Sequence, residues 1–487
     1  MINPQVKIHD NYSFEFKTGF VPDNDPQEIN EFKINTWLFL PNSLDINRDT
    51  YDKNRFYRDV KTYLRLITPT YTLRGILDTP EGPLFYMQKA IESLAAQPGD
   101  AETIEHYTSQ VKMFSCIMKS ALRDEAVLIS KLKSEDEAIS RINEFASLSW
   151  QIVLRYRGLY DLLKEGNIPD KEYHTFLFGD EFVGNVIEQH AYFLMKKFKG
   201  KEYYDKIMPI LTGLMGKEDE HKRKMGFNLP VEGNEEHNKL LIIKRNILKK
   251  FVESDLYLQT IKKKDGAFAE QVLYSIAAGI AMIFATLVTF FATQRYGNFT
   301  MDLFVILVIS YMFKDRIKEV TRYYFTSHMS RKYFDNKRRL KIRNQEIGWT
   351  KEAFDFMPET KVPEEILNMR NRSPLVEAEN EAYGEKVILY RKLVHLSLED
   401  IEKYNQYHVE GINDITVFNI MHFIRKTDDP TLTLYLPDEE NGFKETTGSK
   451  EYPLYIILSC ESNKEIYYYK YRLLFNRNGI SGVSELD

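Results

Sequence analysis

The hydrophobic pattern changes character several times along the chain, and its longest apolar run begins at Gln271. From Gln271 to Gln294 no residue is charged. About 20 apolar residues are enough to cross the hydrocarbon core of a bilayer as a helix. A soluble core helix of that length normally keeps a charged face. The pattern therefore predicts a transmembrane helix.

A second apolar run follows the short polar turn from Arg295 to Asn298. It extends from Thr300 to Phe313, is shorter than the first, and carries Asp302. We expect the two runs to form a two-span transmembrane helical hairpin over residues 271–313. A re-entrant or tilted second helix, and an apolar hairpin buried inside a soluble fold, are the alternatives.

The flanks of the hairpin predict its orientation. Lysines and arginines are dense before it, as at Lys262, and after it, as at Lys314, whereas the turn offers only Arg295. Basic residues are retained on the cytosolic side of a membrane. The sequence therefore predicts a membrane protein with both termini in the cytosol. Its Lys, Asn, Ile and Tyr usage is compatible with a bacterial source, so the expected location is the bacterial inner (cell) membrane.

Small residues recur on one side of the first predicted span. Ala277, Ala281, Ala285 and Thr289 follow one another at every fourth position. Small side chains let two helices approach closely within a membrane. The partner of this stripe is either the second span or the same hairpin of another copy, which would make the protein a homo-oligomer.

The remaining chain predicts an α+β protein that is mainly helical. Apolar residues at helical spacing, such as Val111, Phe114 and Met118, predict a cytosolic helical bundle, and alternating residues such as Leu432 and Leu434 predict a C-terminal β-rich cytosolic domain. The hairpin lies between these two domains. The predicted divisions are 1–82, a small α+β region; 83–236, the helical bundle; 237–270, a basic amphipathic helix; 271–313, the hairpin; 314–346, a basic helix; 347–380, a linker; and 381–487, the β-rich domain.

The two basic segments, 237–270 and 314–346, read as cytosolic continuations of the spans. We expect them to pack as an antiparallel stalk; alternatively, one lies flat on the anionic lipids of the inner leaflet. No nucleic-acid partner is expected, because the formal net charge is only -5 and the topology already explains the basic runs. The expected partner is the lipid bilayer, with anionic inner-leaflet lipids at the basic flanks.

The sequence has no phosphate-binding loop, metalloprotease, nucleophile-elbow or dinucleotide-binding motif. It therefore predicts no cofactor and no metal site, and makes an enzyme the less favoured class without excluding it. The run from Glu218 to His221 offers possible metal ligands, but Lys222, Arg223 and Lys224 follow directly. We interpret this run as a solvated helix end.

One stretch is unusually rich in arginine. Arg55, Arg58, Arg65 and Arg74 lie near the turn formed by Thr68-Pro69-Thr70. Arginines at this density bind phosphate groups well, so this stretch is the sequence-based candidate for an anionic-ligand site. The alternative is an exposed helix with paired charges.

Three functions fit these features. The favoured one is a membrane-anchored, non-enzymatic interaction or sensing protein with large cytosolic domains at the inner leaflet. The first alternative is a membrane-bound enzyme or binder of a phosphate-bearing lipid or nucleotide. The second is a membrane-perturbing effector that acts through oligomerised hairpins.

Overall fold

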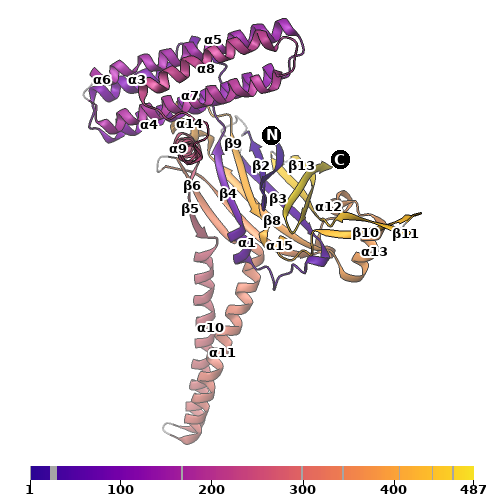
Figure 1. Cartoon of the computed structure of the whole chain (residues 1–487). Coiled ribbons are helices and arrows are strands. Elements are labelled where there is room, and N and C mark those ends of the chain that lie inside the picture. The colour runs from indigo at the N-terminus through magenta and orange to yellow at the C-terminus, as the bar shows by residue number, and fades with distance from the viewer. Residues whose placement is uncertain are drawn as a thin grey trace. The chain divides into compact units, whose positions relative to one another are not determined.

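The computed structural model divides the chain into two compact units (Figure 1). The sheet unit comprises Met1–Leu64, Gln259–Gln406 and Gly411–Asp487, and the helical unit comprises Arg65–Leu258 and Tyr407–Glu410. The structure describes residues 2–21, 30–165, 168–297, 300–342, 345–404, 406–440, 442–462 and 465–486. The chain is α+β with more helix than strand, and its C-terminal region is β-rich, which confirms the predicted fold class at this level.

The described residues of the sheet unit form three sheets. A four-stranded sheet has the order β1-β2-β9-β4, an eight-stranded sheet has the order β14-β13-β12-β3-β8-β7-β6-β5, and β10 pairs with β11. The strands are β1 Ile2–Asp10, β2 Ser13–Phe20, β3 Asn30–Leu40, β4 Val60–Leu66, β5 Gln259–Lys264, β6 Asn336–Ile342, β7 Gln345–Pro358, β8 Lys386–Leu396, β9 Ile412–Asn419, β10 Thr431–Asp438, β11 Gly442–Ser449, β12 Tyr452–Ser462, β13 Glu465–Asn476 and β14 Gly479–Leu486.

The N-terminal and C-terminal strands belong to the same sheet. Strand β3 pairs with β8 on one side and with β12 on the other, all antiparallel. Residues 1–82 and 381–487 were expected to be separate regions, and the structure joins most of them in one unit. Local alternation predicts a strand but does not specify which distant strand it pairs with.

Aromatic side chains fill the space between the two larger sheets. Phe56 stacks on Phe354 of β7 with ring centroids 4.2 Å apart. It also contacts Tyr390 of β8 and Phe418 of β9, at 5.2 and 5.7 Å. These contacts link both sheets to the helix that carries Phe56, so burial of apolar surface holds the two layers together.

The segment 347–380 was expected to be a linker, but it consists of regular secondary structure. It contains most of β7, a 3₁₀ helix η3 and two helices. Its prolines mark element ends: Pro358 closes β7, and Pro374 begins a helix at the first position, where proline is favoured. The short elements of this unit are η1 Asn42–Leu44, α1 Lys53–Asp59, η3 Glu359–Lys361, α12 Glu364–Arg370, α13 Pro374–Tyr383, α14 Leu398–Tyr404 and α15 Met421–Ile424.

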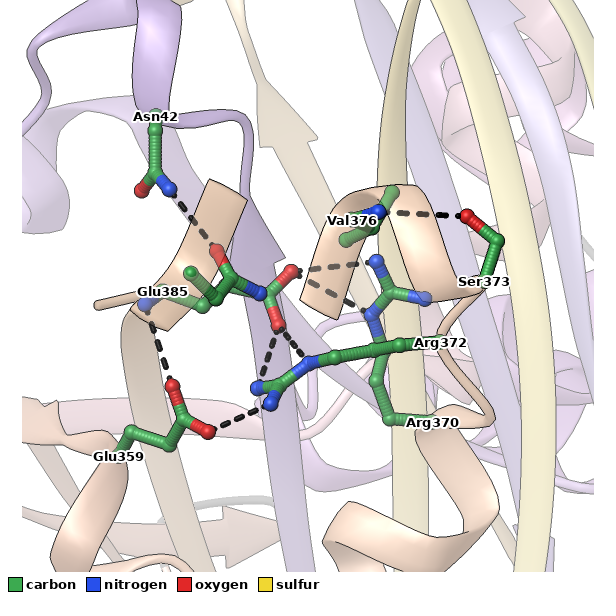
Figure 2. A network of polar contacts seen from close by, with 8 residues as sticks. Asn42, Glu359, Arg370, Arg372, Ser373, Val376 and Glu385 are labelled. Atoms are coloured by element: carbon green, nitrogen blue, oxygen red, sulfur yellow. Dashed lines mark hydrogen bonds and ion pairs between the residues drawn. The ribbon is translucent and has the colours of Figure 1, made fainter. Parts of the chain in front are cut away.

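A buried polar network secures this segment to the sheet (Figure 2). Arg370 donates to Glu385 Oε1 through Nε and Nη2 at 3.3 and 3.2 Å, and Arg372 Nε donates to Glu385 Oε2 at 2.9 Å. The Arg370 guanidinium also lies over the ring of Tyr455, 3.6 Å from its centroid. The single carboxylate of Glu385 is therefore shared by two arginines, which satisfies its charge away from solvent.

The helical unit is a bundle. Its core contains a stack in which Tyr156 lies between Phe114 and Phe176, with ring centroids 4.8 and 4.3 Å apart. Three rings from three different helices thus fix the packing. The elements are α2 Leu73–Asp78, α3 Pro83–Ala96, α4 Ala101–Ser130, α5 Glu135–Gly158, α6 Tyr160–Glu165, α7 Asp170–Phe198, α8 Tyr204–Met225, α9 Glu235–Glu253 and η2 Ser254–Leu256.

A long helical hairpin is inserted between β5 and β6 of the sheet unit. Helix α10, Ala267–Tyr296, leads outward and α11, Met301–Lys332, returns (Figure 1). At its base, Asp265 accepts a hydrogen bond from the Phe334 N–H at 3.2 Å and pairs with Lys351 at 3.2 Å. Gly266 has φ +67, and a Cβ there would lie 2.7 Å from the ring of Tyr333. The entry to the hairpin is therefore tightly constrained.

The hairpin differs from the expected stalk. The segment 237–270 is not one helix continuing the first span: α9 ends at Glu253 in the helical unit, and β5 follows at the sheet edge. The segment 314–346 divides into the second half of α11 and strand β6. Gly266 and the β5–β6 pairing break the helical continuity, so α10 and α11 pack against each other instead.

Candidate functional site

Helix α10 combines high hydropathy with exposure. Its most apolar window has a mean hydropathy of 2.1, and only 17% of that window is buried. Ile283, Phe290 and Phe291 are 63%, 65% and 63% exposed. A core helix of a soluble protein would be mostly buried, so the apolar surface of α10 lacks cover from the rest of this chain.

Helix α11 has 32 residues, but its apolar stretch is too short for it to qualify as a membrane span. Among the described residues, α10 is the single helix that is long and apolar enough to cross a bilayer. In α11 the apolar residues lie between Asp302 and Lys314, and Asp315, Arg316 and Lys318 follow. The predicted two-span hairpin is therefore supported for its first helix only. Asn298, part of the predicted turn, lies outside the described residues.

The seam between the two helices uses only part of the predicted small-residue stripe. Ala277 and Ala281 are buried at 0% and 1% exposure, Ala285 is half-buried, and Thr289 is exposed. A step of four residues exceeds one helical turn of 3.6 residues by about 40°. The stripe therefore rotates away from the partner helix, and the seam passes to Ala292, which is 6% exposed.

A cation–π contact sets the register of the hairpin. The Arg322 guanidinium lies over the ring of Tyr274 at 4.3 Å. Tyr274 donates to Glu270 at 2.6 Å, and Glu270 pairs with Lys264 at 2.5 Å. Counting from this contact along two antiparallel helices of equal rise puts Lys314 at about the level of Met282. The apolar first half of α10 thus runs beside the charged second half of α11.

In this register, a bilayer that covered the full apolar length of α10 would also cover charged residues of α11. A charged side chain at the bilayer centre costs about 2.5–3.5 kcal/mol on insertion scales. A mismatch between protein and bilayer thickness costs only fractions of a kcal/mol per Å. Several charged residues of α11 inside the hydrocarbon would therefore cost more than a local thinning of the bilayer.

The four candidate arginines divide between the two units. Arg55 and Arg58 lie exposed on α1 of the sheet unit, where Arg55 donates to the Thr50 carbonyl at 2.6 Å and Arg58 to the Asn54 carbonyl at 3.3 Å. Arg65 and Arg74 belong to the helical unit, where Arg74 pairs with Glu144 at 2.6 Å. No single unit therefore brings all four arginines together. The anionic-ligand site that their density in the sequence suggested stays a prediction.

A different cationic site lies within the helical unit. Residues of helices α4, α7, α8 and α9 line an open cavity of about 700 Å³, a size typical of small-molecule sites. Four cations and two carboxylates line it together with apolar side chains such as Phe182 and Leu229. The charged lining residues are Lys119, Glu188, Asp219, Arg223, Arg245 and Lys249.

Arg245 is the least satisfied of these residues. Its Nε and Nη2 atoms are buried and make no hydrogen bond within the described part of the chain. The nearest carboxylate oxygen, Oε2 of Glu188, pairs with Nη2 at 3.6 Å. Glu188 is itself held by Lys222 at 2.6 Å, and burial raises the pKa of its carboxyl group. A buried guanidinium edge without a hydrogen-bond acceptor favours an anionic ligand.

One face of the helix end that was expected to be solvated is instead buried, whereas Glu220, Arg223 and Lys224 are exposed as expected. Glu218 and Lys222 of α8 are 0% and 1% exposed. Arg157 of α5 binds Glu218 Oε2 at 2.8 Å and Asp180 Oδ1 of α7 at 2.8 Å, and Asp180 also contacts His221 at 2.7 Å. Positions four apart share one helix face, and here that face turns inward. The four-residue spacing of Glu218 and Lys222 is the sequence feature that could have indicated this buried face.

The sheet unit has its own buried ionic cluster. Lys392 of β8 binds Asp414 of β9 at 2.6 Å, and both side chains are 2% exposed. Glu352 of β7 lies 3.9 Å from Lys392 Nζ and accepts from Thr62 at 2.9 Å. Burial raises the pKa of the Asp414 carboxyl. The charged groups of this cluster pair with one another inside the sheet unit, so we assign it to stability.

Comparison with protein-family models, with curated proteins and with solved structures gave no match. The fold and the two sites described above therefore carry the functional argument.

Proposed function

We propose that the protein is a membrane-anchored, non-enzymatic interaction or sensing protein of the bacterial inner membrane. The hairpin α10–α11 inserts into the bilayer, and both flanking parts of the chain stay in the cytosol. The observation that carries this proposal is the exposed apolar surface of α10. Only 17% of the most apolar stretch of this helix is buried. Lipid is the solvent that such a surface prefers.

The charges around the hairpin support the same topology. Lys314, Arg316, Lys318 and Arg322 follow the apolar part of α11, whereas the described residues of the tip contribute a single cation, Arg295. Such an asymmetry keeps the basic side in the cytosol. It also favours anionic lipids of the inner leaflet as neighbours of these residues.

Membrane fractionation tests the anchor. The wild-type chain is expected to resist alkaline extraction from membranes and to require detergent. Leu287→Arg with Phe290→Arg adds two charges to the apolar face at a cost of roughly 5–7 kcal/mol, so this variant is expected in the soluble fraction or degraded. Leu287 and Phe290 are 51% and 65% exposed, which limits damage to internal packing.

Leu240→Arg is the matched control. Leu240 is equally exposed, at 60%, but lies on α9 of the helical unit. This variant is expected to remain in the membrane. A wild-type chain that stays monodisperse in buffer without any detergent would contradict the anchor.

The cavity of the helical unit favours a second, compatible function. We propose that it binds a small phosphate-bearing anion, which would make the helical unit the sensing part. The Nε and Nη2 atoms of Arg245, which make no hydrogen bond within the described residues, and the excess of cations in the lining support this assignment. The apolar lining residues leave room for a ligand that is more than an inorganic ion.

Calorimetry with pyrophosphate and with adenosine triphosphate, at constant ionic strength, tests the cavity. We expect binding by the wild-type chain and a loss of about tenfold or more in affinity for Arg245→Gln, because a charge-assisted hydrogen bond contributes about 1.5–3 kcal/mol. Lys250→Gln removes an exposed cation of the same helix that does not line the cavity. Equal weakening by both variants, or no binding of either probe, would refute the site.

A further inference from the structure

We propose that the hairpin fits a bilayer that is thinner than average, with a hydrocarbon core of about 20 Å at the protein. This inference rests on the proposed function, because it assumes that the hairpin is inserted. Beyond that function, it specifies the bilayer thickness that the hairpin prefers. The argument depends on the shorter helix, α11, since both helices must share one bilayer.

The apolar band common to both helices is short. On α11 it covers the residues between Asp302 and Lys314, about 17 Å at 1.5 Å per residue. On α10 the same band extends from Arg295 to about Met282, or about 20 Å. A typical hydrocarbon core is about 30 Å thick. The full apolar run of α10 would match that thickness, but α11 does not.

Aromatic and cationic residues mark both ends of this short band. Lys314 Nζ lies 3.6 Å from the ring centroid of Tyr311, which is 63% exposed. At the tip, the guanidinium of Arg295 lies 5.8 Å from the ring centroid of Tyr296, which is 39% exposed. Tyrosines and cations gather at membrane–water interfaces. The two pairs therefore delimit a thin hydrocarbon layer.

A bilayer of ordinary thickness would enclose charges that this chain leaves uncovered. Asp315, Arg316 and Glu319 are exposed on α11 just beyond Lys314. Glu319 pairs with Arg322 at 3.4 Å and is still 63% exposed at its side chain. In a single inserted hairpin these residues would face lipid. Keeping them at the interface requires the bilayer to thin around the hairpin, which also makes the hairpin a local perturbation of the membrane.

Vesicles of graded thickness test this inference with the full chain. Purified protein is diluted from detergent into phosphatidylcholine vesicles whose monounsaturated chains have fourteen, eighteen or twenty-two carbons, and the fraction that floats with the vesicles after alkaline washing is measured. We expect about tenfold more inserted wild-type protein in the thinnest vesicles than in the thickest, with intermediate insertion at eighteen carbons.

A variant with a longer apolar run should move the optimum to the eighteen-carbon vesicles. It carries Lys314→Leu, Asp315→Leu, Arg316→Leu, Lys318→Leu and Glu319→Leu. The control exchanges the same residues with conservation of charge, as Lys314→Arg, Asp315→Glu, Arg316→Lys, Lys318→Arg and Glu319→Asp, and should keep the fourteen-carbon optimum.

The wild-type series decides the inference even if the leucine variant misfolds. Insertion that is independent of thickness, or best at eighteen or twenty-two carbons, would overturn it and would indicate that a second copy covers the charged face of α11. Such a result would leave the membrane anchor intact. Failure to insert into any of the three vesicles would instead overturn the proposed function itself.

Discussion

Lys392→Met is expected to lower the free energy of unfolding of the sheet unit by about 3–5 kcal/mol. The lysine is the direct partner of Asp414, at 2.6 Å, and both are 2% exposed. Without it, Asp414 remains buried beside Glu352, which is 1% exposed. A buried carboxylate that loses its cation must either stay charged without a partner or take up a proton.

Urea denaturation followed by tryptophan fluorescence measures this effect. A Trp150→Phe background leaves Trp37 and Trp349, so the signal comes from the sheet unit alone. The double variant Lys392→Met with Asp414→Leu should recover most of the lost stability, because replacement of a whole buried ion pair by apolar residues is often neutral. A single variant that unfolds within about 0.5 kcal/mol of wild type would show that the pair is not buried as described.

Arg157→Met should destabilise the helical unit by a similar amount. Arg157 is the shared partner of Asp180 and Glu218, whose side chains are 3% and 0% exposed. The change leaves two carboxylates inside the bundle, and His221 can compensate only Asp180, which it contacts at 2.7 Å. We expect a loss of about 3–5 kcal/mol.

Hydrogen exchange of the detergent-solubilised full chain checks this expectation within one unit. Backbone amides in the cores of α5, α7 and α8 should exchange roughly 100–4000-fold faster, since each tenfold corresponds to about 1.4 kcal/mol. Arg123→Met is the control, because Arg123 pairs with Asp124 on the surface, where the two side chains are 55% and 52% exposed. Equal acceleration in both variants would argue against the buried cluster.

Lys392 lies in the sheet unit and Arg157 in the helical unit, so the two substitutions together test whether these units have separate cores. Lys392→Met should leave exchange in α5, α7 and α8 near the wild-type rate, and Arg157→Met should leave the fluorescence transition of the sheet unit unchanged. Effects of mutations that share no partners and lie in separate cores are normally independent.

The sequence by itself determined the features that depend on neighbouring residues. The apolar run from Gln271 to Gln294 became α10, because the apolar length of a helix is a local property. Alternation at Leu432 and Leu434 predicted a strand, which is β10, and the overall class, α+β with a β-rich C-terminal region, followed. The sequence also shows that the second apolar run ends before Lys314. This run is too short for α11 to qualify as a membrane span, although a second span was predicted.

Only the tertiary structure decided which distant residues meet. It brought β3 between β8 and β12, assigned Arg55 and Arg74 to different units, and gathered Lys119, Glu188 and Arg245 around one cavity. It also turned Glu218 and Lys222 inward, toward α5 and α7. The physical reason is that a charged residue looks the same in sequence whether it faces water or a buried partner. The choice is made by the packing of elements far apart in the chain.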